Sequence, residues 1–167
     1  MKSFQTKVFF VFLATAFALS ACGGSGGTNQ NANSANQSSN VNTNSNLTKD
    51  DAEEFAKSVN LPFVPEEVVW RETDAASGKK MIAVLRFSAA AAQTIAAQAE
   101  KYKPSARDAI DAEDWFPPEL VAQSQQSGDE VLKGTSYAAN DFYSEIYKNG
   151  KLTRVNDTNY FVLELTN

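Results

Sequence analysis

The composition of the chain changes abruptly near residue 48, and this change limits where a folded core can form. Residues 23–48 contain eight Asn together with Gly, Ser and Thr, but no charged, aromatic or proline residue. Such a segment buries too little apolar surface to offset the entropy lost on folding. We expect it to be a disordered tether with a root-mean-square span of ~30 Å. One globular domain is then expected in the 119 residues of 49–167.

The first 21 residues have the pattern of a cleaved signal peptide. Lys2 and Lys7 precede residues 8–19, which are uncharged and mostly apolar. This run is shorter than the ~20 apolar residues that a membrane-spanning helix needs. One interpretation is an ordinary signal peptide whose end happens to read Ala21-Cys22.

The end of this segment supports a more specific interpretation. Leu19-Ser20-Ala21-Cys22 resembles the lipobox of bacterial lipoproteins. The resemblance implies cleavage before Cys22 and lipidation of its sulfur and its new amino group, which together anchor a protein stably to a membrane. Gly23 after the cysteine resembles the pattern for transfer to the outer membrane in bacteria that have two membranes. The expected location is therefore the cell envelope, with residues 22–48 as the lipidated cysteine and its tether.

Lipidation of Cys22 would leave the mature protein without a disulfide, because the chain has no other cysteine. The domain must then be held by its own core. Loss of Lys2 and Lys7 with the signal peptide leaves 13 basic and 20 acidic residues, a net charge of −7. A negative net charge disfavours nucleic acid as a partner.

Two main helices are expected in the domain. Thr48 is the expected N-cap of a helix over residues 49–59, with Asp51 in the capping-box position. Its apolar stripe consists of Ala52, Phe55, Ala56 and Val59. Ser88 is the expected N-cap of a second helix over residues 89–102, whose apolar side is formed by Ala91, Ile95, Ala99 and Tyr102.

Alternating apolar residues predict an antiparallel or mixed sheet of five or six strands. The expected strands are 67–73, 80–87, 130–137, 142–148, 151–155 and 160–166. Asn149-Gly150 suits a two-residue type I′ hairpin turn, which would pair Tyr147 with Leu152 and Glu145 with Arg154. The predicted fold class is α+β: a single small domain in which the helices pack on one face of the sheet.

A run of acidic residues beside a tryptophan forms the first candidate site: Asp111, Glu113, Asp114 and Trp115. Carboxylates next to an aromatic ring occur in sugar-binding clefts and glycosidases, and hydrolysis requires two carboxyl groups at a fixed separation. A structural interpretation is also open: Pro117 or Pro118 begins a short helix through Gln125, and Trp115 or Phe116 packs on Leu120.

The second candidate site is a polar aromatic face on the expected hairpin. Alternation places Tyr143, Tyr147, Leu152 and Arg154 on one side of the sheet, where Tyr160 is able to join them. Tyrosine and arginine are enriched at binding hot spots. The alternative is the half-buried face of an antiparallel sheet, where tyrosine is equally common.

The residues that are missing limit the enzymatic possibilities. The sequence has no histidine, which excludes Ser-His-Asp and Cys-His catalysis and the usual zinc sites. No glycine-rich nucleotide-binding motif follows an expected strand, and we expect no cofactor or metal. The sequence favours a non-enzymatic, lipid-anchored envelope module with a protein or glycan partner. The alternative is a carboxylate-dependent hydrolase or carbohydrate-binding protein that uses Asp111, Glu113, Asp114 and Trp115.

Overall fold

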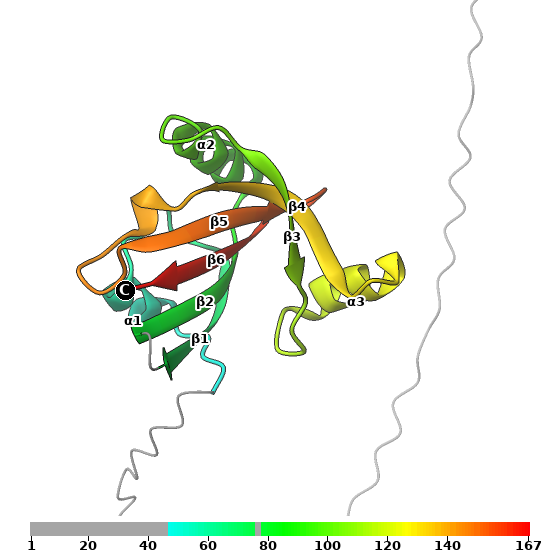
Figure 1. The fold of residues 1–167 in the computed structure, drawn as a ribbon, viewed down its shortest axis with the longest axis horizontal. Coiled ribbons are helices and arrows are strands. Elements are labelled where there is room, and N and C mark those ends of the chain that lie inside the picture. The colour runs from blue at the N-terminus through cyan, green and yellow to red at the C-terminus, as the bar shows by residue number, and fades with distance from the viewer. Residues whose placement is uncertain (1–46, 76–77) are drawn as a thin grey trace, which may run out of the picture. The chain divides into compact units, whose positions relative to one another are not determined.

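A single antiparallel sheet of six strands organises residues 47–75 and 78–167, the parts of the chain that the computed structural model describes (Figure 1). The strand order is β1-β2-β6-β5-β4-β3. The elements in chain order are α1 (Ala52–Ser58), β1 (Glu67–Ala75), β2 (Gly78–Arg86), α2 (Ala89–Ala99), β3 (Ala106–Asp111), α3 (Pro118–Ser127), β4 (Val131–Ala138), the 3₁₀-helix η1 (Asn140–Phe142), β5 (Asn149–Val155) and β6 (Tyr160–Thr166). The predicted α+β class is confirmed, with three α-helices in place of two. The expected signal peptide, Cys22 and most of the expected tether lie outside the described residues.

The last strand, β6, lies in the middle of the sheet between β2 and β5. Its side chains alternate between the two faces of the sheet, as the sequence predicts. Phe161, Leu163 and Leu165 belong to one buried cluster, whereas Tyr160 and Val162 belong to another. Because both faces of this strand are apolar, both faces of the sheet need cover.

The first face of the sheet is covered by α1 and α2. Phe55 of α1 packs against Trp70 of β1 with 5.7 Å between ring centroids, and Ile95 of α2 joins the same buried cluster. Phe87 and Phe161 meet edge to face at 5.8 Å. The Ser88 hydroxyl caps α2 by accepting a hydrogen bond from the Ala91 amide at 3.3 Å, as predicted.

The second face is covered by α3, so the expectation that the helices share one face was wrong. Leu120 of α3 is fully buried with Phe116, Leu132 and Val162. In Figure 1, α3 lies beside the start of β4, away from α1 and α2. The short helix itself and the packing of Phe116 near Leu120 follow the structural interpretation of this stretch.

The helix α1 begins later than predicted because Asp51, not Thr48, is its N-cap. The Asp51 carboxylate accepts hydrogen bonds from the Glu53 and Glu54 amides, both at 2.9 Å. Lys49 instead forms a β-bridge with Trp70 on the outer edge of β1. Of the predicted apolar stripe, Phe55 and Val59 are buried, while Ala52 and Ala56 are exposed.

The predicted hairpin at Asn149-Gly150 does not form. Asn149 begins β5, where Gly150 pairs with Leu165 of β6, and a Cβ on Gly150 would lie 2.1 Å from the Glu164 carbonyl oxygen. The glycine therefore allows close approach of two strands rather than a tight turn. Residues 143–148 form no strand, because the Ser144 hydroxyl accepts hydrogen bonds from the Ile146 and Tyr147 amides, each at 3.2 Å.

One strand of the sheet, β3, was not predicted from the sequence. It pairs with β4 at the far edge of the sheet. Because β5 pairs with β4 and not with the residues before Asn149, Leu152 lies opposite Tyr137 rather than Tyr147. Arg154 lies opposite Thr135 rather than Glu145.

Candidate functional site

Trp115 of the first candidate site is held in place by its neighbours. Its indole Nε1 donates a hydrogen bond to the Glu113 carboxylate at 2.6 Å. Its ring meets Phe116 edge to face at 4.7 Å, and the Arg71 guanidinium lies 4.9 Å above it. These contacts use the indole donor and part of the ring, so Trp115 mainly packs the loop before α3 against β1.

The acidic residues of this stretch are only partly brought together. Asp111 and Glu113 line a small cavity of about 220 Å³, in which Lys80, Lys151 and Glu164 also lie. Asp114 is exposed and does not line that cavity. The predicted set of three carboxylates is therefore divided, and two of them share their space with lysines.

Two residues that line this cavity, Lys151 on β5 and Glu164 on β6, form a network of ion pairs with Asp108 on β3. Lys151 Nζ lies 2.8 Å from Asp108 Oδ2 and 3.0 Å from Glu164 Oε2. The buried Thr153 hydroxyl donates to the same Asp108 oxygen at 3.2 Å. The Lys151 ammonium holds the pKa of Asp108 below its usual range. These contacts connect β3, β5 and β6 and are best explained as stabilising the sheet.

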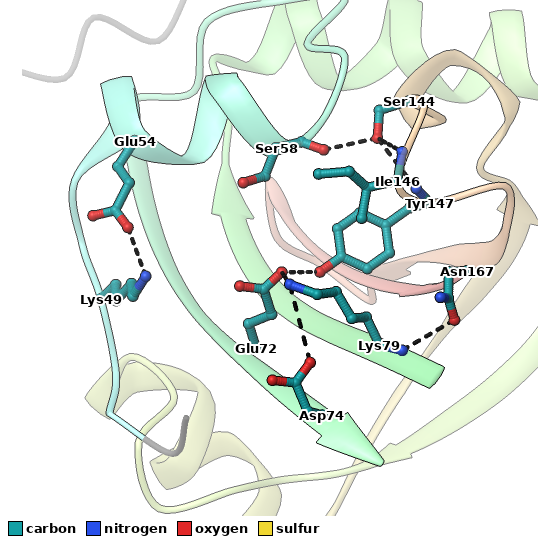
Figure 2. Close-up of polar contacts among 10 residues, drawn as sticks. All are labelled: Lys49, Glu54, Ser58, Glu72, Asp74, Lys79, Ser144, Ile146, Tyr147 and Asn167. Carbon is teal, nitrogen blue, oxygen red and sulfur yellow. Dashed lines mark hydrogen bonds and ion pairs between the residues drawn. The ribbon is translucent and has the colours of Figure 1, made fainter. Parts of the chain in front are cut away.

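Most of the second candidate site lies on the first face of the sheet: Tyr147 and Leu152 are buried in its cluster, and Tyr143 packs against that cluster. Tyr160 lies on the opposite face. Tyr147 is fully buried on the first face, and its hydroxyl donates a hydrogen bond to Glu72, beside which Lys79 and Asp74 lie (Figure 2). Burial raises the pKa of Tyr147 well above its ordinary range, and the Glu72 carboxylate adds to this rise. Arg154 lies over the Phe161 ring with 5.9 Å between the guanidinium carbon and the ring centroid.

Tyr160 is on the opposite face from Tyr147, where it connects three elements. Its hydroxyl donates to Glu67 Oε2 at 3.0 Å and also contacts the carboxylate of Glu119. Glu67 in turn accepts a hydrogen bond from Arg86 at 2.7 Å, and Arg86 followed by Tyr160 lowers the pKa of Glu67. A hydroxyl has one hydrogen, so it donates to only one of the two carboxylates at a time. The group lies beside an open cavity of about 490 Å³ and links the start of α3 to β1 and β6.

Tyr143 belongs to a different site, which we call the tyrosine pocket and define by Tyr102, Tyr137 and Tyr143. The three rings line one open cavity of about 450 Å³. Tyr102 follows the end of α2, Tyr137 lies on β4 and Tyr143 follows η1. The pocket therefore combines residues from three separate parts of the chain at one end of the sheet.

Two of the rings are fixed at their hydroxyl ends. Tyr102 donates a hydrogen bond to Asp141 Oδ1 at 2.6 Å, which raises the pKa of Tyr102. Tyr143 donates to the Gly150 carbonyl at 3.3 Å. The Tyr102 side chain nevertheless remains 54% exposed, whereas Tyr137 and Tyr143 are half-buried. Rings held in this way present surface to a ligand with little further loss of freedom on binding.

Sequence reasoning placed Tyr102 on the buried side of the second helix and did not connect it with Tyr143. The helix α2 ends at Ala99, three residues before Tyr102, so the chain has left helical geometry when it reaches this tyrosine. The available signal was local: Lys101, Tyr102 and Lys103 are followed by Pro104, a pattern that favours the end of a helix.

Within residues 47–75 and 78–167, no group of three or more His, Cys, Asp or Glu side chains is arranged to hold a metal ion. None of the helices in these two segments is long and apolar enough to cross a membrane. Comparisons of the chain with protein-family models, curated proteins and solved structures found no significant match.

Proposed function

We propose that the protein is a non-enzymatic binding module of the cell envelope and that the tyrosine pocket is its ligand site. The observation that carries this proposal is the convergence of Tyr102, Tyr137 and Tyr143 on one open cavity of about 450 Å³. Tyrosine combines a large apolar ring with a polar hydroxyl and loses little side-chain entropy on binding. Open cavities of this size with aromatic walls are typical ligand sites.

The location of the module rests on the sequence. The resemblance of Leu19-Ser20-Ala21-Cys22 to a lipobox supports a lipid anchor on Cys22. Residues 23–48 would then let the domain reach ~30 Å from its attachment point. In a bacterium with two membranes, Gly23 favours the outer membrane. The partner is an envelope glycan or an envelope protein.

The hydrolase alternative receives less support from the geometry. Glycoside hydrolysis needs two carboxyl groups that face the substrate across a fixed gap. Glu113 is hydrogen-bonded to Trp115, and Asp114 does not line the cavity that Asp111 and Glu113 share. Glu67 and Glu119 do approach a common group, but that group is the Tyr160 hydroxyl, which occupies the space between them.

The proposal is tested by photo-crosslinking of the full lipidated chain in the bacterial envelope. A photoreactive phenylalanine analogue replaces Tyr102, and in the matched control it replaces Ile146, which is 41% exposed but does not line the pocket. We expect a specific adduct from position 102 that disappears when Tyr143→Ala is added. Adducts of the same kind and yield from both positions would contradict the proposal, as would none from position 102.

A further inference from the structure

We infer that the tyrosine pocket takes an anionic saccharide, in which the rings pack against the sugar and Lys103 pairs with a carboxylate on it. This inference rests on the proposed function and adds the chemical class of the ligand. Three features support it: the tyrosine rings with their polar neighbours, the basic side chains in the lining, and the occupied backbone amide on the adjoining edge of β3.

The pocket contains both aromatic rings and polar groups, a combination that suits a sugar. A pyranose has apolar C–H faces and a rim of hydroxyl groups. The exposed ring of Tyr102 offers a stacking surface, while the Asn140 amide and Ser136 hydroxyl line the same pocket and are able to bond to sugar hydroxyls. A purely apolar ligand would leave these polar groups without partners, which is costly.

The charged side chains that line the pocket are basic, although the chain as a whole is acidic. The chain carries a formal net charge of −5, whereas the pocket is lined by Lys103 and Lys151, and its lining within residues 47–75 and 78–167 includes no carboxylate. The Asp141 carboxylate, which is not part of this lining, accepts the hydrogen bond of Tyr102 at 2.6 Å. Lys151 is already neutralised by Asp108 and Glu164. Lys103 makes no ion pair in the described part of the chain.

The cavity beside Tyr160 has the opposite character. Asp50, Glu66, Glu67 and Glu119 line the cavity beside Tyr160. An anionic ligand is repelled there and attracted to Lys103 instead, so the charge distribution itself selects between the two cavities. A carboxylate on the ligand would form a charge-assisted hydrogen bond with Lys103.

An acidic peptide is the competing ligand, and the edge of β3 argues against it. An extended peptide in this pocket would gain most of its affinity by pairing with β3, which is an edge strand that adjoins the pocket at Ala106. The amide of Ala109 on that strand is already bonded to the Asp108 carboxylate at 2.9 Å. The edge therefore lacks a donor that strand addition requires, whereas a saccharide needs none.

The test is binding of defined oligosaccharides to the full chain in detergent, measured by calorimetry. The probes are tetramers of galacturonic acid and of glucuronic acid, each compared with its neutral methyl ester. We expect the acids to bind about tenfold more tightly than the esters, because one charge-assisted contact is lost. Lys103→Gln should remove this difference. Lys57→Gln is the matched control, since Lys57 is an exposed lysine that lines neither the tyrosine pocket nor the adjoining cavity that shares Tyr102.

Each result separates this inference from the proposed function. If neither acid binds, or if Lys103→Gln and Lys57→Gln behave alike, the anionic saccharide is ruled out. If an acidic peptide binds at the pocket and the sugars do not, the inference is wrong and the binding function stands. The proposed function is tested separately, and the absence of a crosslink from position 102 would contradict it.

Discussion

Asp108 on β3 reaches across the whole of β4 to Lys151 on β5, with 2.8 Å between Asp108 Oδ2 and Lys151 Nζ. The residue that lies opposite Asp108 on the intervening strand is Gly134. Because this glycine has no side chain, the carboxylate passes over the strand and also accepts a hydrogen bond from Thr153. A Cβ on Gly134 would lie 2.4 Å from the Arg154 carbonyl oxygen.

Gly134→Ala should destabilise the domain by roughly 1–3 kcal/mol, because the methyl group meets backbone that cannot move aside without separating β4 from β5. Urea unfolding measures the change. Ser136→Ala, two residues along the same strand, is the control and should change the free energy of unfolding by much less. A Gly134→Ala protein as stable as the wild type would show that the strands have room to adjust.

The same contact predicts how stability depends on pH. The pKa of Asp108 is lowered in the folded state, so its contribution to stability is present above the unfolded carboxyl pKa of about 4 and is lost as the pH falls through the folded value. Asp108→Asn should cost roughly 1–3 kcal/mol near pH 7. The difference from the wild type should shrink below about pH 4. A difference that is constant from pH 7 to pH 3 would contradict the pairing.

Tyr147 is predicted to act through stability rather than binding. Tyr147→Ala removes a fully buried ring and should cost about 3–5 kcal/mol. Tyr147→Phe keeps the ring and removes only the hydrogen bond to Glu72, so its cost should be about 1 kcal/mol. Chemical denaturation of both variants checks the prediction. Two variants of equal, near wild-type stability would indicate that Tyr147 is not part of the core.

The anchor makes a separate prediction. Cys22→Ala should abolish membrane association, because none of the helices within residues 47–75 and 78–167 is apolar and long enough to span a membrane, and the lipid is the proposed attachment. Detergent-phase partitioning of the wild type and the variant measures this. Unchanged partitioning of Cys22→Ala would mean that another segment holds the protein.

The parts of the fold that could be predicted are those in which local pattern and tertiary contact agree. Phe161, Leu163 and Leu165 alternate along β6 and are all buried on one face. Ser88 is followed by a helix-forming run, and its side chain caps α2. In both cases the local preference and the final contacts favour the same structure.

Other parts could not be predicted because a distant contact overrides the local preference. Asn149-Gly150 is a good turn sequence, but pairing of Gly150 with Leu165 on β6 makes it the start of a strand. The strand β3 has one large apolar residue, Ile110, which packs against the second-face cluster, while Asp108 bonds to β5. Its sequence therefore lacks the alternation that identifies a strand.

The candidate site was still harder to predict. Tyr143 was among the expected binding residues, but its predicted partners Tyr147 and Tyr160 lie on opposite faces of the sheet. Its actual neighbours in the pocket are Tyr102, which the sequence places on the apolar side of the second expected helix, and Tyr137, which the sequence gives only as the end of an expected strand. A pocket formed from three elements leaves no motif in any one of them.

The most direct test of the tyrosine pocket is partner capture and thermal melting measured on the same preparation of the Tyr102→Ala protein. Because Tyr102 is more than half exposed, the melting temperature should change little, while capture from the envelope should fall sharply. Ile146→Ala, another exposed apolar truncation, should leave both unchanged. Full capture by a normally folded Tyr102→Ala protein would contradict the proposal that this pocket binds the partner.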